Sequence, residues 1–191
     1  MIGIGVRGLL FGSALVLTGC GGGGGGSDAG TGPNPSPDPI IAAFAADTTA
    51  PGGNTVSMLE GSKSGDTVTV RVAVTNTTAL YATAFDLTYD DTQVTYVSHS
   101  AGQLFEQGGH APTYQVNVPD PGRVVVAVSR NGNVGTVNAS GTVDAVRLTF
   151  RVRAKGASRA EFGLAPVLYD GQPTPQPKPG INWTAGTFQG S

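Results

Sequence analysis

The sequence of 191 residues has little of the chemistry on which enzymes and nucleic-acid-binding proteins depend. One Cys and two His exclude a disulfide framework and any metal site built from several cysteines. Only 13% of the residues are charged, and 11 Lys and Arg stand against 13 Asp and Glu, for a formal net charge of −2. Because nucleic-acid binding depends on a basic excess, we expect no nucleic-acid partner.

The short motifs of catalysis are also absent. There is no G-x-S-x-G nucleophile elbow, no H-E-x-x-H zinc pair and no G-K-[ST] phosphate loop. Asp90 and Asp91 could begin a calcium site, but adjacent acids in a turn after a strand more often cap backbone amides. His99 and His110, with Glu106 between them, are too sparse for a catalytic or metal site. We therefore predict a protein that is not an enzyme and has no metal and no cofactor.

The first 19 residues are predicted to be a signal sequence. Arg7 precedes an apolar run over residues 8–17, which is too short to span a bilayer. The run ends in LTGC (17–20), which resembles the lipobox of bacterial lipoproteins. This resemblance implies cleavage before Cys20 and acylation of its thiol and new amino group, and several acyl chains give stable anchoring. The alternative is an ordinary secretory signal with an incidental cysteine.

The residue after Cys20 bears on the expected location. Gly21 stands where an Asp would favour retention in the inner membrane, by resemblance to the usual sorting rule for bacterial lipoproteins. The sequence therefore predicts a lipid-anchored protein of the outer membrane, on its periplasmic or its cell-surface side.

Residues 20–53 are predicted to form a flexible tether. Ten Gly and five Pro lie in this segment, which begins with six consecutive glycines. Such a composition buries too little apolar surface to offset the entropy of ordering. A short apolar patch at residues 40–46 interrupts it, and the pattern fits either a docking strand or a single helical turn.

Residues 54–191 are predicted to form one all-β domain. Val and Thr are its most frequent residues, and β-branched side chains favour strands over helices. Apolar and polar residues alternate along its predicted strands, so every second side chain faces the core and the others face solvent. The inward set is Val68, Val70, Val72, Val74, Phe85, Leu87 and Tyr89.

Further strands are expected at 94–99, 113–118, 123–129, 142–153, 161–168 and 183–188. Gly, Pro, Asn and Asp turn signals separate them. Eight or nine short strands without helices predict an antiparallel β-sandwich. The Pro-alternating segment 171–180 is predicted to be an extended, exposed loop.

Four segments in order resemble the cohesin domain family over nearly all of residues 54–191. They are GDTVTV (65–70), FDLTYD (85–90) with Val94 beyond it, GQLF (102–105), and GTV followed by LTF and a glycine (141–156). The resemblance implies a nine-stranded jelly-roll sandwich, related in fold to certain carbohydrate-binding modules. It also implies a dockerin-like or other secreted protein partner, since cohesins bind dockerins in assemblies that degrade polysaccharides.

The expected partner surface is an open sheet face of outward-facing residues. It consists of Ala82, Ala84, Asp86 and Thr88, joined by Gln115 and Asn117 from the 113–118 strand. Ala82 and Ala84 stand where cohesins of cellulose-degrading complexes often carry polar residues.

Two other functions remain open. A carbohydrate-binding module would stack polysaccharide on exposed rings, of which Trp183 is expected to be the most exposed, with Tyr81 as a second candidate. Tyr114 shares the parity of Val116 and Val118 and is expected in the core. The third possibility is a structural component of an envelope secretion or pilus assembly.

Overall fold

The computed structural model describes residues 38–171 and 174–191, so the predicted signal sequence, Cys20 and the tether as far as Pro37 lie outside the described residues. The described residues contain twelve strands and one short 3-10 helix, η1 (Gln107–Gly109). The strands are β1 (Ala42–Ala46), β2 (Thr55–Ser64), β3 (Thr67–Thr88), β4 (Val94–Ala101), β5 (Thr113–Asp120), β6 (Arg123–Ser129), β7 (Val137–Val152), β8 (Gly156–Phe162), β9 (Val167–Asp170), β10 (Gln176–Pro177), β11 (Asn182–Thr184) and β12 (Gly186–Gly190).

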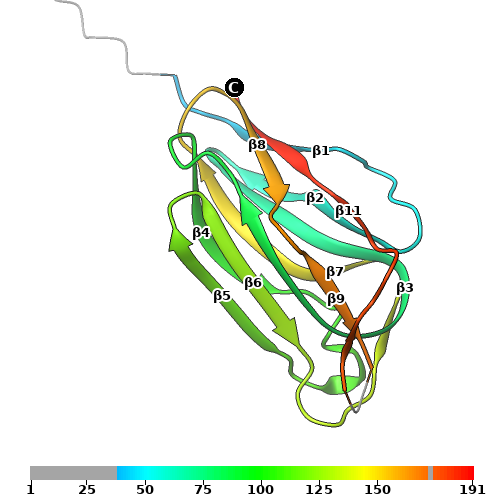
Figure 1. Ribbon diagram of the computed structural model, residues 1–191. Helices are drawn as coiled ribbons and strands as arrows, with labels where there is room; N and C mark the ends of the chain where they lie inside the picture. The colour runs from blue at the N-terminus through cyan, green and yellow to red at the C-terminus, as the bar shows by residue number, and fades with distance from the viewer. Residues whose placement is uncertain (1–37, 172–173) are drawn as a thin grey trace, which may run out of the picture. The chain divides into compact units, whose positions relative to one another are not determined.

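The strands form two packed layers (Figure 1). In one layer β2, the first half of β3, β7 and β4 are neighbours, and β11 pairs in parallel with β2. In the other, β5, β6 and the second half of β3 are followed by β9 and β8, and then by β12 and β1. All pairs except β11–β2 are antiparallel, which confirms the predicted antiparallel β-sandwich.

The two layers share one strand, the 22-residue β3. The chain passes from layer to layer at residues 76–79, where the register with β7 shifts and Asn76 and Ala79 take positive φ angles of 44° and 56°. Two asparagine side chains hold this crossing. Asn76 Oδ1 accepts a hydrogen bond from Gly141 N at 2.8 Å, and Asn138 Oδ1 accepts one from Ala79 N at 2.9 Å.

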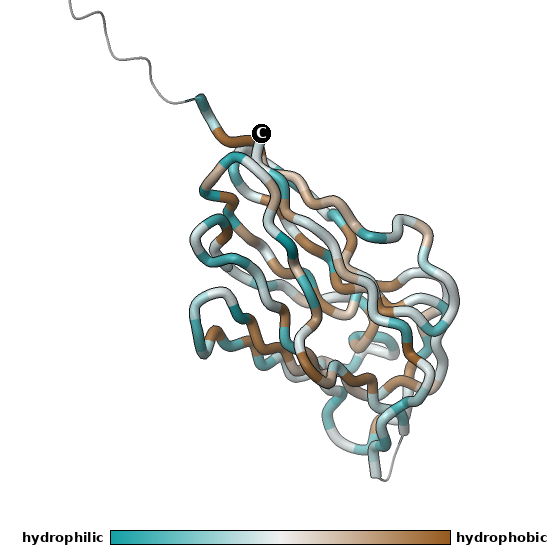
Figure 2. The backbone as a smooth tube through the Cα atoms, turned by 45° about the horizontal axis from the view of Figure 1, so that its top comes forward, coloured by the Kyte–Doolittle hydropathy of each residue, from teal (hydrophilic) through white to brown (hydrophobic). Residues whose placement is uncertain are grey.

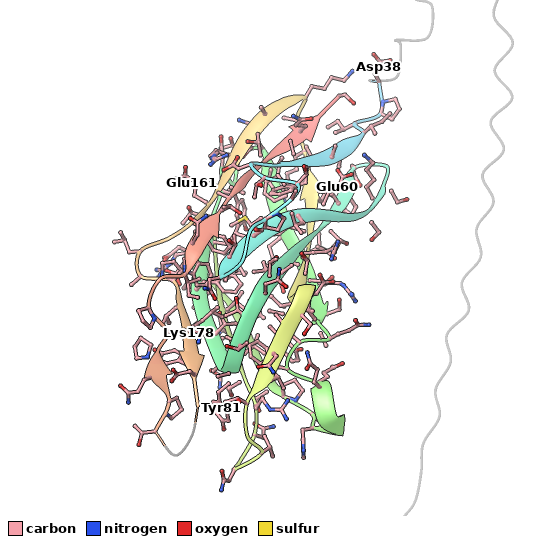
Figure 3. All side chains as sticks on the ribbon, turned by 90° about the vertical axis from the view of Figure 1, so that its right-hand side faces the viewer. Asp38, Glu60, Tyr81, Glu161 and Lys178 are labelled. Atoms are coloured by element: carbon pink, nitrogen blue, oxygen red, sulfur yellow. The ribbon has the colours of Figure 1, made fainter. Side chains whose placement is uncertain are left out.

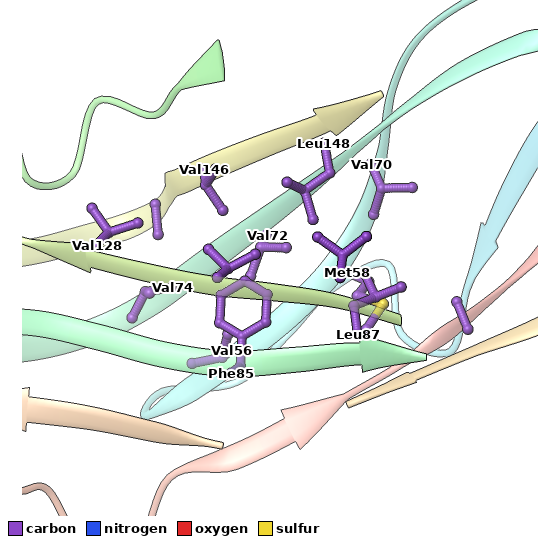
Figure 4. Packing of buried hydrophobic residues seen from close by; sticks show 14 of the residues in the cluster. Val56, Met58, Val70, Val72, Val74, Phe85, Leu87, Val128, Val146 and Leu148 are labelled. Atoms are coloured by element: carbon purple, nitrogen blue, oxygen red, sulfur yellow. The ribbon is translucent and has the colours of Figure 1, made fainter. Parts of the chain in front are cut away.

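The core lies between the layers and is built from alternating side chains, as the sequence predicts. Hydrophobic and hydrophilic residues alternate along the strands (Figure 2), and side chains of β2, β3, β6 and β7 meet in the interior (Figure 4). The inward set on the first half of β3, Val68, Val70, Val72 and Val74, is fully buried. Phe85 and Leu87 are buried on the second half, and Tyr89 packs on the core with its ring 5.4 Å from that of Phe150.

Several elements differ from the expected ones because pairing partners far away in the sequence decide them. The apolar patch is a strand, β1, paired with β12, so the compact unit Asp38–Ser191 includes residues assigned above to the tether. The expected strand at 161–168 is divided between β8 and β9, with Ala165 at a φ of 58° between them. In the Pro-alternating loop, Gln176 and Pro177 pair with β9, while residues 172–173 lie outside the described ones.

We expect Phe44→Ala to lower the free energy of unfolding by about 3–5 kcal/mol, because the Phe44 ring is buried against Phe188 with centroids 5.1 Å apart. The melting temperature of the full chain should fall by roughly 10 °C in thermal denaturation. Ile41→Ala is the matched control, since Ile41 is 58% exposed, and it should change little. Equal melting temperatures for both variants would contradict the docking of β1.

Candidate binding face

All six residues expected on a partner surface lie on one solvent-facing side of the layer that contains β5 and β6. In register, Ala82 lies opposite Ser129 on β6 and Tyr169 on β9. The next rows place Ala84 opposite Ala127 and Val167, Asp86 opposite Val125, and Thr88 opposite Arg123. On β5, Gln115 lies opposite Ala127 and Asn117 opposite Val125. We call this surface the β5–β6–β3–β9 face.

The centre of the β5–β6–β3–β9 face is lined by small side chains. Ala82, Ala84, Ala127 and Ser129 are partly buried there, and the exposed Gln115 lies beside them. Together with Tyr169 they line a shallow depression of about 190 Å³. A surface with so little relief allows another protein segment to approach the sheet closely.

The other end of this face carries an ion pair. Arg123 donates to Asp86 Oδ2 through Nε at 2.9 Å and Nη2 at 2.5 Å, and its Nη1 lies 3.6 Å from Asp120. The hydrogen bonds with Asp86 raise the pKa of Arg123 above its ordinary value. The face therefore combines a small-residue centre with a polar end.

Sequence reasoning missed part of this face. Val125, Ala127 and Ser129 share the outward parity of the 123–129 strand, so their alternation with Val124, Val126 and Val128 was the available signal. No sequence signal placed Tyr169 on this face, because its position depends on pairing with Ala82, 87 residues earlier in the chain.

Of the two rings expected to stack on sugars, Tyr81 is buried and Trp183 is partly buried. Trp183 packs against the core, with its ring 4.8 Å from Phe162 and 6.2 Å from Phe85. Tyr81 is 8% exposed and donates its hydroxyl hydrogen to Gly132 O at 2.9 Å. It lies at the end of the sandwich opposite Asp38 (Figure 3). Trp183 is therefore only partly exposed, because β11 places its ring against the buried Phe85 and the partly buried Phe162.

Tyr114 packs on the core as expected, and its hydroxyl group hydrogen-bonds to both the N and the O of Gly102. Val118, of the same parity, is 46% exposed near the free end of β5. His99 and His110 are both exposed, and His99 Nδ1 lies 2.9 Å from the Tyr96 hydroxyl.

The described residues contain no group of three or more His, Cys, Asp or Glu side chains placed to hold a metal ion. Asp90 instead accepts hydrogen bonds from the Thr92 hydroxyl at 2.6 Å, from Thr92 N at 2.9 Å and from Gln93 Nε2 at 3.0 Å. Its carboxylate therefore closes the turn after β3. Within residues 38–171 and 174–191, no helix is long and apolar enough to cross a membrane.

The comparisons with known proteins agree with this geometry. The family model for the cohesin domain matches residues 54–176, and the chain belongs to the cohesin domain family. Cohesins are non-catalytic binding modules. Among curated proteins, none matches this chain.

Solved cohesins share the jelly-roll-type sandwich. A type II cohesin domain from the cellulosome of Acetivibrio cellulolyticus is 13% identical, with a TM-score of 0.55, covering 80% of this chain and 95% of that one. The sixth cohesin of scaffoldin B from the same organism, in complex with a Cel5 dockerin, is 20% identical, with a TM-score of 0.54 and coverages of 75% and 96%. A non-cellulosomal cohesin from the archaeon Archaeoglobus fulgidus is 16% identical, with a TM-score of 0.51 and coverages of 68% and 86%.

The turn at Asp90 leads to a prediction about pH. Its hydrogen bonds, those from Thr92 first, hold the pKa of Asp90 below its ordinary value. The ionised Asp90 carboxylate therefore stabilises the folded state at neutral pH, and this stabilisation is lost as pH falls below about 4 and the carboxylate is protonated. Asp90→Asn keeps an acceptor for Thr92 N but has no charge to titrate, so its melting temperature should fall less between pH 6 and pH 3 than that of the unmodified chain. An identical fall in both would contradict this role.

Proposed function

We propose that the protein is a non-catalytic module that recruits a secreted protein partner through the β5–β6–β3–β9 face. The observation that carries the proposal is the small-residue centre of that face, where Ala82, Ala84 and Ala127 lie side by side on paired strands. Flat, solvent-facing sheets with small side chains suit close contact with another protein, whereas polysaccharide binding favours exposed rings, which Trp183 and Tyr81 do not provide.

The partner that we propose is dockerin-like. Two solved cohesins with the same fold are complexes with dockerins, one with a Cel5 dockerin and one with the dockerin of a scaffoldin. Tyr169 and the Asp86–Arg123 pair flank the alanines and supply an aromatic anchor and fixed charges, which are the groups that commonly dominate protein interfaces. A link to polysaccharide degradation would follow from the enzymes that such a partner carries.

The replacement Ala84→Arg tests the location of the surface. It places a long cation at the centre of the face, so we expect it to abolish capture of a saturable partner from the secreted and envelope proteins of the source organism. The measurement is quantitative pull-down with the full chain. Ala157→Arg is the matched control, because Ala157 is an exposed alanine on β8, away from the face, and it should bind as the unmodified chain does.

Loss of binding in both variants would indicate a general effect of the new charge. Retention in both would place the partner elsewhere. Binding of a neutral polysaccharide by the unmodified chain, with no protein retained, would support the carbohydrate-module alternative instead.

We also propose that Cys20 anchors the module in the outer membrane through attached lipid. The support is the sequence LTGC after an apolar run, followed by Gly21. The domain would then be held at the membrane by the Gly- and Pro-rich segment between Cys20 and β1.

Cys20→Ser tests the anchor independently of the binding face. The serine hydroxyl cannot replace the thiol that is acylated, so the variant should lose incorporation of labelled fatty acid and leave the outer-membrane fraction. Unchanged label and fractionation would show that the protein is not a lipoprotein of this type. Ala84→Arg, as a control, should keep its label.

A further inference from the structure

The opposite side of the sandwich carries a second, chemically different surface. On the outward side of the layer formed by β2, β3, β7 and β4 lies an open pocket of about 440 Å³. Its polar lining comes from Ser62, Thr69, Arg71, Gln103, Thr142, Asp144 and Arg147. No aromatic side chain lines it, so its character differs from that of the β5–β6–β3–β9 face.

Two arginines in this pocket share one buried carboxylate. Arg71 approaches Asp144 Oδ1 with Nε at 2.8 Å and with Nη2 at 2.7 Å. Arg147 donates from Nε to Asp144 Oδ2 at 2.7 Å. The Asp144 side chain is 4% exposed, whereas the side chains of Arg71 and Arg147 are 34% and 39% exposed. The pairing fixes both guanidinium groups and leaves their outer edges open to solvent.

Local irregularities of the sheet build this arrangement. A shift of register in the β3–β7 pair leaves Ala145 unpaired, which reverses the alternation of β7 and puts Asp144 and Arg147 on the same side. A second irregularity in β2 lies at Gly61, where an added Cβ would come within 3.1 Å of Arg71 Cγ and 3.0 Å of Thr69 O. Gly61 therefore leaves the space that the Arg71 side chain occupies.

The charges around the pocket do not cancel. Two acids at the same layer already have partners outside the pocket, since Asp66 pairs with Arg151 at 3.2 Å and Glu60 with Lys63 at 3.1 Å. Asp144 alone faces Arg71 and Arg147, so one positive charge is left over. Among the described residues, Arg71 Nη1 and both Nη atoms of Arg147 have no hydrogen-bond partner. An anion would use these donors.

We propose that this pocket, the Arg71–Arg147 pocket, binds the carboxylate of an acidic sugar, with a hexuronate as the ligand class. The free guanidinium edges would bind the carboxylate by charge-assisted hydrogen bonds, and a fixed planar fork suits that geometry. Ser62, Thr69, Gln103 and Thr142 line the same pocket and supply hydroxyl and amide groups for the hydroxyls of the sugar ring. The proposal does not depend on partner binding at the opposite face.

An acidic sugar fits these observations better than an acidic peptide. The lining of hydroxyl, amide and guanidinium groups offers many polar partners, with Val143 as its one apolar side chain larger than a methyl group and no ring, whereas peptide recognition commonly uses aromatic anchors. Rows of polar residues extend the surface beyond the pocket, since β4 places Ser98 and Ser100 opposite Thr149 and Arg147. A polymer of hexuronate units would find further polar contacts along these rows.

The test measures binding of trigalacturonate and of its methyl ester to the full chain in detergent by calorimetry at low ionic strength. The ester keeps the sugar and removes the charge. We expect trigalacturonate to bind at least about tenfold more tightly than the ester. Arg147→Gln should weaken the binding of trigalacturonate by at least about tenfold, because it loses charge-assisted hydrogen bonds. Arg159→Gln, which removes one arginine from β8, outside both surfaces, is the matched control and should bind like the unmodified chain.

Arg147→Gln leaves both contacts of Arg71 to Asp144, so the fold should survive, and thermal denaturation checks this. A second measurement needs no variant: the Nε–H resonance of Arg147 should shift when trigalacturonate is added. The proposal is overturned if trigalacturonate does not bind or if the ester binds equally well. It is also overturned if Arg147→Gln binds trigalacturonate as tightly as the control variant does. Arg147-dependent binding of a glutamate-rich peptide, without binding of trigalacturonate, would also overturn it.

Discussion

The passage of β3 from one layer to the other is the constraint on which the rest of the structure depends. A strand of 22 residues cannot stay in one layer of a sandwich this small. The crossing at residues 76–79, within β3, directs the two halves of the strand to opposite layers. Asn76 and Ala79 adopt left-handed backbone conformations there, which cost free energy for residues other than glycine. The hydrogen bonds of the Asn76 and Asn138 side chains offset part of this cost.

Because β3 belongs to both layers, it contributes to both proposed surfaces. Its first half presents Arg71 to the Arg71–Arg147 pocket, and its second half presents Ala84 and Asp86 to the β5–β6–β3–β9 face. The inward residues of both halves belong to one core cluster. The two surfaces therefore lie on opposite sides of the same core, so a protein on one would leave the other accessible.

The alternation of Val68 to Val74 and of Phe85 and Leu87 made the core and the outward set of β3 predictable from the sequence, since a period of two depends only on local geometry. Where that period fails, the prediction failed too. Thr55–Met58 on β2 are buried at four consecutive positions, and β1 consists of four alanines and a phenylalanine, so neither strand carries the signal. The ion pair of Asp144 with Arg71 joins residues 73 positions apart. It depends on the bulge at Ala145 in β7, which no pattern in the sequence predicts.

The position of the first and last residues of the compact unit shows towards which end of the sandwich the small-residue centre of the β5–β6–β3–β9 face lies. Ile41 and Ser191 exchange backbone hydrogen bonds at 3.1 Å, so both ends of the compact unit meet at one end of the sandwich. Asp38 lies at that end and Tyr81 at the other (Figure 3). Ala82 and Ala84 follow Tyr81 directly on β3, whereas Thr88 lies further towards the Asp38 end. The small-residue centre is therefore displaced away from Asp38, so a partner bound there would contact the Tyr81 end of the sandwich rather than the end where Ile41 and Ser191 pair.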